Sequence, residues 1–112
     1  GGSKHVATAL LAMNKKFPEI RSAINLKYNK DNITKLKKTK LIISSYDRNA
    51  EPNKIKTKEG SSIEWGIRAA LKKSKIAPDV IYHKGDFGKE PMIIIFAKTP
   101  ASIIEKVSKL FN

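Results

Sequence analysis

The sequence predicts a single α/β domain, a three-layer α/β/α arrangement in which helices cover both faces of a mixed β-sheet. Strand-like apolar runs alternate with segments of helical periodicity along most of the chain. One pair of strand-like runs has no helix between its members, which indicates a direct β-β connection and hence a mixed sheet. The 112 residues are enough for one hydrophobic core but not for two.

The first half of the chain predicts two helices and two strands. Residues 4–17 are predicted to form a helix that ends at Pro18, because apolar side chains recur on one helical face: Val6, Leu10, Met13 and Phe17. A short strand follows at residues 22–28. Asp31 is then expected to cap a short basic helix whose inward side chains are Ile33 and Leu36. The second strand covers residues 41–46, and its apolar start predicts burial on both faces.

The second half predicts a helix, two strands and a last helix. Ser61 and Glu64 form a capping box, and the helix after them turns one face inward: Ile63, Ile67, Ala70, Leu71 and Ser74. Pro78 precedes the third strand at residues 80–82, and residues 91–97 read as a central strand. Thr99 caps the last helix with Pro100 at its first position, and its expected inward residues are Ile103, Val107, Leu110 and Phe111.

The composition excludes several classes of protein. It is 40% apolar and 29% charged, which is ordinary for a soluble domain, and no apolar run approaches the roughly 20 residues of a membrane span. No signal peptide is recognisable, and the absence of cysteine excludes disulfides and thiolate metal sites. We therefore expect a cytoplasmic protein. Residues 1–3, Gly-Gly-Ser, read as a remnant of cloning, which leaves residues 4–112 as the domain.

The net charge of +13 raises the question of nucleic-acid binding. Only three of the 23 basic residues are arginines, the residue type that favours bidentate reading of bases and phosphates. The lysines are scattered rather than clustered. We therefore expect a solvated lysine surface around an anion-binding site, and not a nucleic-acid partner.

Two charged clusters follow or precede predicted strands, where open α/β sheets bind their ligands. Glu19 and Arg21 precede the first strand, and Asp47 and Arg48 directly follow the second, where a plain surface ion pair is the alternative. A third candidate is the start of the helix at "EGSSIEW". Unpaired N–H groups there could hold a phosphate beside Ser61 and Ser62, although the same residues could simply cap the helix. Trp65 could stack on a heteroaromatic ring or pack in the core.

The stretch "VIYHKGDFGKEPMIIIF" places five ionisable side chains between two strands. His83 can act as an acid or base near neutral pH, and Lys89 can bind phosphate. Asp86 and Glu90 offer hard oxygen ligands for a divalent cation, and Gly85 and Gly88 permit a positive φ and close backbone approach. The alternative is a polar hairpin with solvated charges.

Motifs of several enzyme classes are missing. The sequence contains no Walker A motif, no G-x-S-x-G and no H-E-x-x-H. What remains is a set of cations, backbone amides, carboxylates and one well-placed histidine. Such a set suits a reaction in which phosphate or pyrophosphate leaves and is stabilised electrostatically.

Four segments together resemble the ThiN-type thiamine-phosphate synthase domain: "FPEIRSAINLKYN", "SYDRNAEP", "EGSSIEWGI" and "PDVIYHKGDFGKEPMIIIF". The resemblance extends from about His5 to Phe111, and its most specific part is the run Gly85, Gly88, Lys89, Glu90 and Pro91. It implies a transferase that joins hydroxymethylpyrimidine diphosphate and a thiazole phosphate to thiamine phosphate, with release of pyrophosphate. It also implies Mg²⁺ as cofactor, an archaeal source and a kinase domain fused on the N-terminal side.

The resemblance implies roles for residues as well. An arginine and a histidine accompany synthase activity in the family; His83 matches the histidine, and Arg21 and Arg48 stay open for the arginine. Phosphate or substrate contacts fall to Asn25, Asp47, Ser61, Ser62, Trp65, Gly85, Gly88 and Lys89, and metal contacts to Asp86 and Glu90. We expect a homo-oligomer. Related domains also serve as thiamine-phosphate sensors fused to helix-turn-helix segments, and such a sensor is the alternative function.

Overall fold

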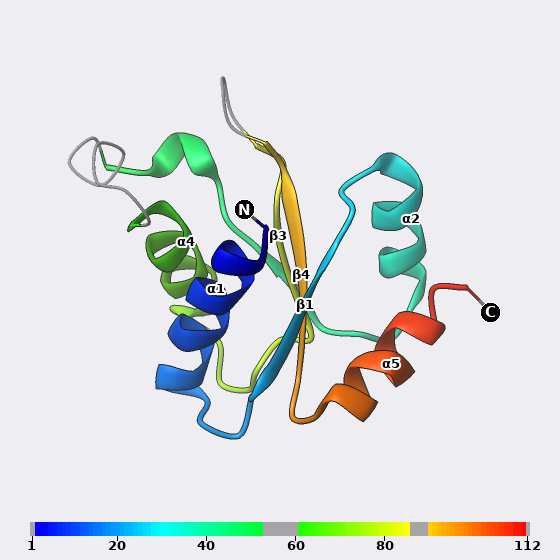
Figure 1. Ribbon diagram of the computed structural model, residues 1–112. Helices are drawn as coiled ribbons and strands as arrows, with labels where there is room; N and C mark the ends of the chain where they lie inside the picture. The colour runs from blue at the N-terminus through cyan, green and yellow to red at the C-terminus, as the bar shows by residue number, and fades with distance from the viewer. Residues whose placement is uncertain (1, 53–60, 86–89, 112) are drawn as a thin grey trace.

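The computed structural model describes residues 2–52, 61–85 and 90–111, and it has the predicted order of elements (Figure 1). The elements are α1 (Gly2–Lys16), β1 (Ser22–Leu26), α2 (Lys30–Lys38), β2 (Ile43–Ser45), a 3₁₀ turn η1 (Arg48–Ala50), α4 (Ser61–Leu71), β3 (Val80–His83), β4 (Met92–Ala97) and α5 (Pro100–Ser108). Within these described residues, no helix is long and apolar enough to cross a membrane.

The four strands form one mixed sheet in the order β1-β4-β3-β2. Strand β4 is antiparallel to both β1 and β3, whereas β2 runs parallel to β3. The prediction of a central strand at residues 91–97 is confirmed, with the strand beginning one residue later, at Met92. This topology brings the carboxyl ends of β1, β2 and β3 to one edge of the sheet, beside the start of β4. We call this the site edge; it is the upper end of the sheet in Figure 1.

Helices cover both faces of the sheet, with α1 and α4 on one side and α2 and α5 on the other (Figure 1). Successive side chains of β4 point to opposite faces of the sheet, so they pack against different helical layers. Ile94 and Phe96 pack with α1 and α4, while Ile93, Ile95 and Ala97 pack with α2 and α5. Burial of each large apolar side chain is worth about 1.5–3 kcal/mol. The predicted three-layer arrangement is therefore present, because helices pack against both faces of the central strand.

Strand β2 differs from its prediction. It has three residues, two of them half-buried and one exposed, so burial on both faces is wrong. The reason is its position, since β2 is the outermost strand of the sheet and pairs with β3 alone. An edge strand has a neighbour on one side only, whatever its sequence.

Two details of the helix ends also differ. The cap of α2 is Asn29, whose side chain accepts a hydrogen bond from the Asn32 N–H at 2.7 Å, and not Asp31. Asp31 lies within the helix and pairs with Lys35 at 3.2 Å. Phe111 was expected to face inward but is 63% exposed, because α5 ends at Ser108 and helical spacing no longer directs the side chain. The capping of α5 by Thr99, with Pro100 next, is confirmed.

Candidate functional site

A cavity of about 530 Å³ opens at the site edge where the parallel strands β2 and β3 end. It is lined by Ser45, Tyr46, Asp47, Arg48, Tyr82, Lys84 and Gly85. The carboxyl ends of parallel strands are the usual ligand-binding position of open α/β sheets. Cationic, acidic and aromatic side chains meet in this cavity, which suits a ligand with both an anionic group and a ring.

Arg48 is the most deeply placed cation of the cavity. It lies in the 3₁₀ turn η1 directly after β2 and is only 7% exposed. Its Nε atom lies 3.5 Å from Oε2 of Glu51, which is 3% exposed. A buried charge requires a partner, because desolvating an isolated ion is very unfavourable. Glu51, across the turn, is therefore the buried acidic neighbour of Arg48, while Asp47 and Arg48 both line the cavity.

Glu51 also connects the turn to α4. Its Oε1 atom accepts a hydrogen bond from the hydroxyl of Ser62, in the first turn of that helix. Ser62 therefore supports Glu51 and does not line the cavity, unlike the phosphate contact that was predicted for it. Helix α4 begins at Ser61, as the sequence suggested.

Tyr46 forms the aromatic wall of the cavity and was not singled out by the sequence. Its ring packs edge-to-face on Trp65, with centroids 6.1 Å apart, so Trp65 acts as a support behind the cavity. Its hydroxyl is buried without a hydrogen-bond partner among the described residues. Burial raises the pKa of Tyr46 to about 12, with Arg48 lowering and Glu51 raising that pKa by smaller amounts. Tyr46 is therefore a neutral phenol at pH 7.

Gly66 explains how Tyr46 fits against α4. A Cβ atom added at this position would lie 2.2 Å from Cε2 and Cζ of the Tyr46 ring, far inside van der Waals contact. A glycine in the middle of a helix is unfavourable by about 0.8–1.0 kcal/mol relative to alanine. The interior glycine of "IEWGIR" was the sequence signal for this contact, because it marks a place where another group approaches the helix closely.

Gly66→Ala is expected to displace Tyr46 and to destabilise the domain by about 1–3 kcal/mol, since overpacking exceeds the gain in helix propensity. Urea unfolding of the variant measures this change. In a Tyr46→Ala background, where the ring is absent, the same Gly66→Ala substitution should no longer destabilise the domain. A Gly66→Ala domain as stable as the parent would show that the ring is not confined here.

His83 lies behind the cavity rather than in its lining. It is 1% exposed, and its ring centroid is 5.0 Å from that of Tyr46. Its Nδ1 accepts a hydrogen bond from the Gly85 N–H at 3.0 Å, which leaves the ring proton on Nε2. Gly85 has a φ of 86°, so the predicted positive φ at this glycine is confirmed.

The charge state of His83 follows from its surroundings. The pKa of His83 is lowered to about 4, first by burial and then by the nearby charge of Arg48, while Glu51 acts in the opposite direction. The imidazole is therefore neutral at pH 7. An acid or base titrating near neutral pH, as the sequence suggested, does not fit this environment. The geometry makes His83 a support for Tyr46 and Gly85, both of which line the cavity.

The two arginines left open by the sequence are separated by the structure. Arg21 is exposed at the start of β1, where its N–H donates to the carbonyl of Ala97 at the end of β4. Four steps of about 3.3 Å along β1 separate this end of the sheet from the site edge. Of the two, Arg48 lines the cavity, whereas Arg21 lies at the opposite edge together with Glu19.

A second, smaller cavity of about 280 Å³ lies at the site edge between the end of β1 and the start of β4. Asn25 and Glu90 both line it, together with Tyr28. Tyr28 and Tyr82 are neighbours, with ring centroids 6.3 Å apart, so the two cavities adjoin across this pair. Asp86, Gly88 and Lys89 lie outside the described residues.

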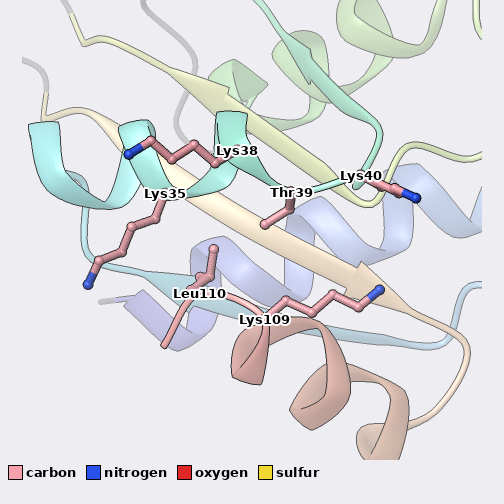
Figure 2. Close-up of a pocket in the computed structure, with 6 residues that line it drawn as sticks. All are labelled: Lys35, Lys38, Thr39, Lys40, Lys109 and Leu110. Carbon is pink, nitrogen blue, oxygen red and sulfur yellow. The ribbon is translucent and has the colours of Figure 1, made fainter. Parts of the chain in front are cut away.

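A third cavity, of about 410 Å³, lies between α2 and α5 and is lined mainly by lysines (Figure 2). Figure 2 shows the ammonium groups of Lys35 and Lys38 pointing to one side and those of Lys40 and Lys109 to the other. The cations therefore do not converge on a common point. Lys35 is moreover paired with Asp31. We regard this cavity as part of the solvated lysine surface.

Comparison with known proteins matches residues 1–109 to the family model described as thiamine-phosphate synthase ThiN. The chain is 41% identical to "Thiamine-phosphate synthase ThiN" of Methanothermobacter thermautotrophicus. The alignment covers all of this chain and 59% of that protein. It is 38% identical to "Bifunctional thiamine biosynthesis protein ThiDN" of Methanocaldococcus jannaschii, covering 26% of that protein. The chain thus spans about three fifths of the first relative and a quarter of the second.

Two crystal structures are also similar. The C-terminal domain of a phosphomethylpyrimidine kinase superposes with a TM-score of 0.87 at 44% identity, over 95% of this chain and 60% of that chain. A second C-terminal domain gives a TM-score of 0.79 at 38% identity, over 96% of this chain and 58% of the other. With the family model matching nearly all of its residues, the chain belongs to the ThiN thiamine-phosphate synthase family.

Proposed function

We propose that this chain is the synthase domain that joins hydroxymethylpyrimidine diphosphate to a thiazole phosphate and releases pyrophosphate, in the cytoplasm. The observation that carries the proposal is Arg48, a buried guanidinium that lines a cavity at the site edge. Guanidinium groups bind phosphate oxygens with two parallel hydrogen bonds, which is the recognition that a diphosphate substrate requires. Relatives named as a thiamine-phosphate synthase and a thiamine biosynthesis protein support thiamine phosphate as the product.

The chemistry divides into a bond that breaks and a bond that forms. The C–O bond between the pyrimidine methylene and the diphosphate breaks, and the leaving pyrophosphate takes the electron pair. The methylene carbon becomes a cation stabilised by the aminopyrimidine. The lone pair of the thiazole nitrogen then forms the C–N bond, and the positive charge passes to the thiazolium ring. No protein nucleophile is needed, which agrees with the lack of nucleophile motifs in the sequence.

The cavity residues have roles that fit this course. Arg48 and Lys84 bind and stabilise the departing phosphate groups. The rings of Tyr46 and Tyr82 provide faces on which a cationic heterocycle can lie. His83 positions Tyr46 and the Gly85 backbone from behind and does not contact the substrate.

Mg²⁺ is proposed as the cofactor that accompanies the diphosphate. In the described parts of the chain, no group of three potential metal-ligating side chains is found. Mg²⁺ in phosphoryl and diphosphate sites commonly uses one or two carboxylates together with substrate phosphates, and Asp47 in the cavity lining meets that need. When bound, the ion would neutralise charge on the leaving group. Glu90, in the adjoining cavity, is the second carboxylate of the site edge.

The test is to incubate the purified chain with both phosphorylated precursors and Mg²⁺ and to assay thiamine phosphate. Product that depends on both precursors supports the proposal. Tight binding of thiamine phosphate by calorimetry without any turnover would instead establish the sensor alternative. Absence of both turnover and binding would reject the site as a thiamine-phosphate site.

The organisation of the whole protein is also a proposal. One relative is named as bifunctional, and the first solved structure is titled the C-terminal domain of a kinase. We extend this arrangement to the present protein, with a kinase domain on the N-terminal side of the synthase domain and an archaeal source. Self-association, measured by sedimentation, is expected as well.

A further inference from the structure

We propose that Glu51 is a positioning residue, which holds the guanidinium of Arg48 in the orientation that phosphate binding requires. The inference rests on the proposed function, because it assumes that Arg48 binds a phosphate group. Glu51 is not among the residues that line the cavity, so it acts on the ligand through Arg48. The sequence places it in a polar loop and gives no indication of this role.

The contact between the two side chains leaves the outer part of Arg48 for a ligand. Glu51 approaches the guanidinium at Nε, the inner nitrogen, with its Oε2 atom 3.5 Å away. The terminal nitrogens of Arg48 form the planar fork that pairs with two phosphate oxygens. This contact is an ion pair and not a hydrogen bond, so the carboxylate favours the observed orientation of the guanidinium through its charge, without taking the phosphate's place.

Glu51 is itself held by a hydrogen bond at one carboxylate oxygen, and its side chain is 0% exposed. Oε1 accepts the hydrogen bond from the hydroxyl of Ser62, while Oε2 faces Arg48. In addition, the Glu51 N–H donates to the carbonyl of Arg48 at 3.3 Å and so closes the turn. The hydrogen bond from Ser62 and the backbone hydrogen bond of the turn keep the carboxylate beside Arg48, and they connect the end of β2 to the start of α4.

Stability alone does not account for the pair. A buried ion pair loses so much hydration that well-packed apolar residues in its place are often neutral or stabilising. A charge kept in the interior beside a cavity is more readily explained by what the cavity binds. The orientation of Arg48 toward a phosphate is such an explanation.

The experiment measures the binding of inorganic pyrophosphate, in the presence of Mg²⁺, by calorimetry at a temperature well below unfolding. Glu51→Gln is expected to raise the Kd about tenfold, equivalent to about 1.4 kcal/mol, and Ser62→Ala about threefold. Glu19→Gln, an exposed carboxylate at the opposite edge, is the matched control and should leave the Kd unchanged. Thermal unfolding of each variant is recorded in parallel.

The outcomes separate the two proposals. If Glu51→Gln lowers the melting temperature but leaves the pyrophosphate Kd of the folded protein unchanged, Glu51 is a structural residue and the inference is overturned. If Glu51→Gln does not fold, Ser62→Ala decides, and an unchanged Kd in that variant overturns the inference equally. If the parent chain itself does not bind pyrophosphate, the proposed function fails first.

Discussion

Replacing Arg48 with methionine is expected to abolish pyrophosphate binding and thiamine-phosphate formation and to destabilise the domain by about 3–5 kcal/mol. The loss of binding follows because methionine has no charge and no hydrogen-bond donor. The loss of stability follows because the buried carboxylate of Glu51, whose side chain is 0% exposed, would lose the guanidinium charge beside it. Denaturant unfolding and the two-precursor assay measure the two effects separately.

A double variant separates the two effects of Arg48. Arg48→Met combined with Glu51→Gln removes both charges and should recover much of the lost stability while activity stays absent. Arg68→Met, at an exposed position of α4, is the control and should change neither property. Turnover in Arg48→Met comparable to the parent would remove Arg48 from the reaction.

The buried histidine is expected to make the domain sensitive to acid. The pKa of His83 is lowered from 6.5 to about 4 in the folded protein, so between these values the unfolded chain binds a proton that the folded chain does not. Stability from this group is complete above pH 6.5 and is lost as the pH falls toward 4. The loss is on the order of 3 kcal/mol, at 1.36 kcal/mol per pKa unit.

Urea unfolding at pH 7 and pH 4.5 measures this effect in the parent and in His83→Asn, whose side chain does not titrate. The difference in stability between the two pH values should be smaller in His83→Asn by about 2–3 kcal/mol. His5→Asn is the control, because it removes the exposed second histidine of the chain. An equal pH dependence of stability in the parent and in His83→Asn would show that folding does not lower the pKa of His83.

The elements of this fold could largely be predicted because their signals are local. The spacing of Val6, Leu10 and Met13 defines a helix wherever the helix packs, and Thr99 with Pro100 caps α5 through neighbours in the sequence. The central position of β4 was readable because a strand buried on both faces is apolar at consecutive positions. The position of β2 was not, because an edge strand is defined by the neighbour it lacks.

The candidate site divides in the same way. The sequence by itself placed Asp47, Arg48, Gly85 and His83 at strand ends, and the four segments around them were enough to suggest the family. Only the tertiary structure distinguished Arg48 from Arg21. Arg48 follows the end of β2 and lines the cavity, whereas Arg21 lies at the start of β1, at the opposite edge of the sheet.

The structure also showed where His83 and Ser62 lie and what they contact, and it placed Tyr46 and Glu51 beside them. Burial keeps the His83 imidazole neutral at pH 7. The Tyr46 ring packs against Gly66 of α4, a helix that is distant from β2 in the sequence. Glu51 acquires its importance from two contacts, to Arg48 in its own turn and to Ser62 on α4. Residue identity determined the available chemistry, whereas long-range packing set the burial, and therefore the charge and orientation, of each group.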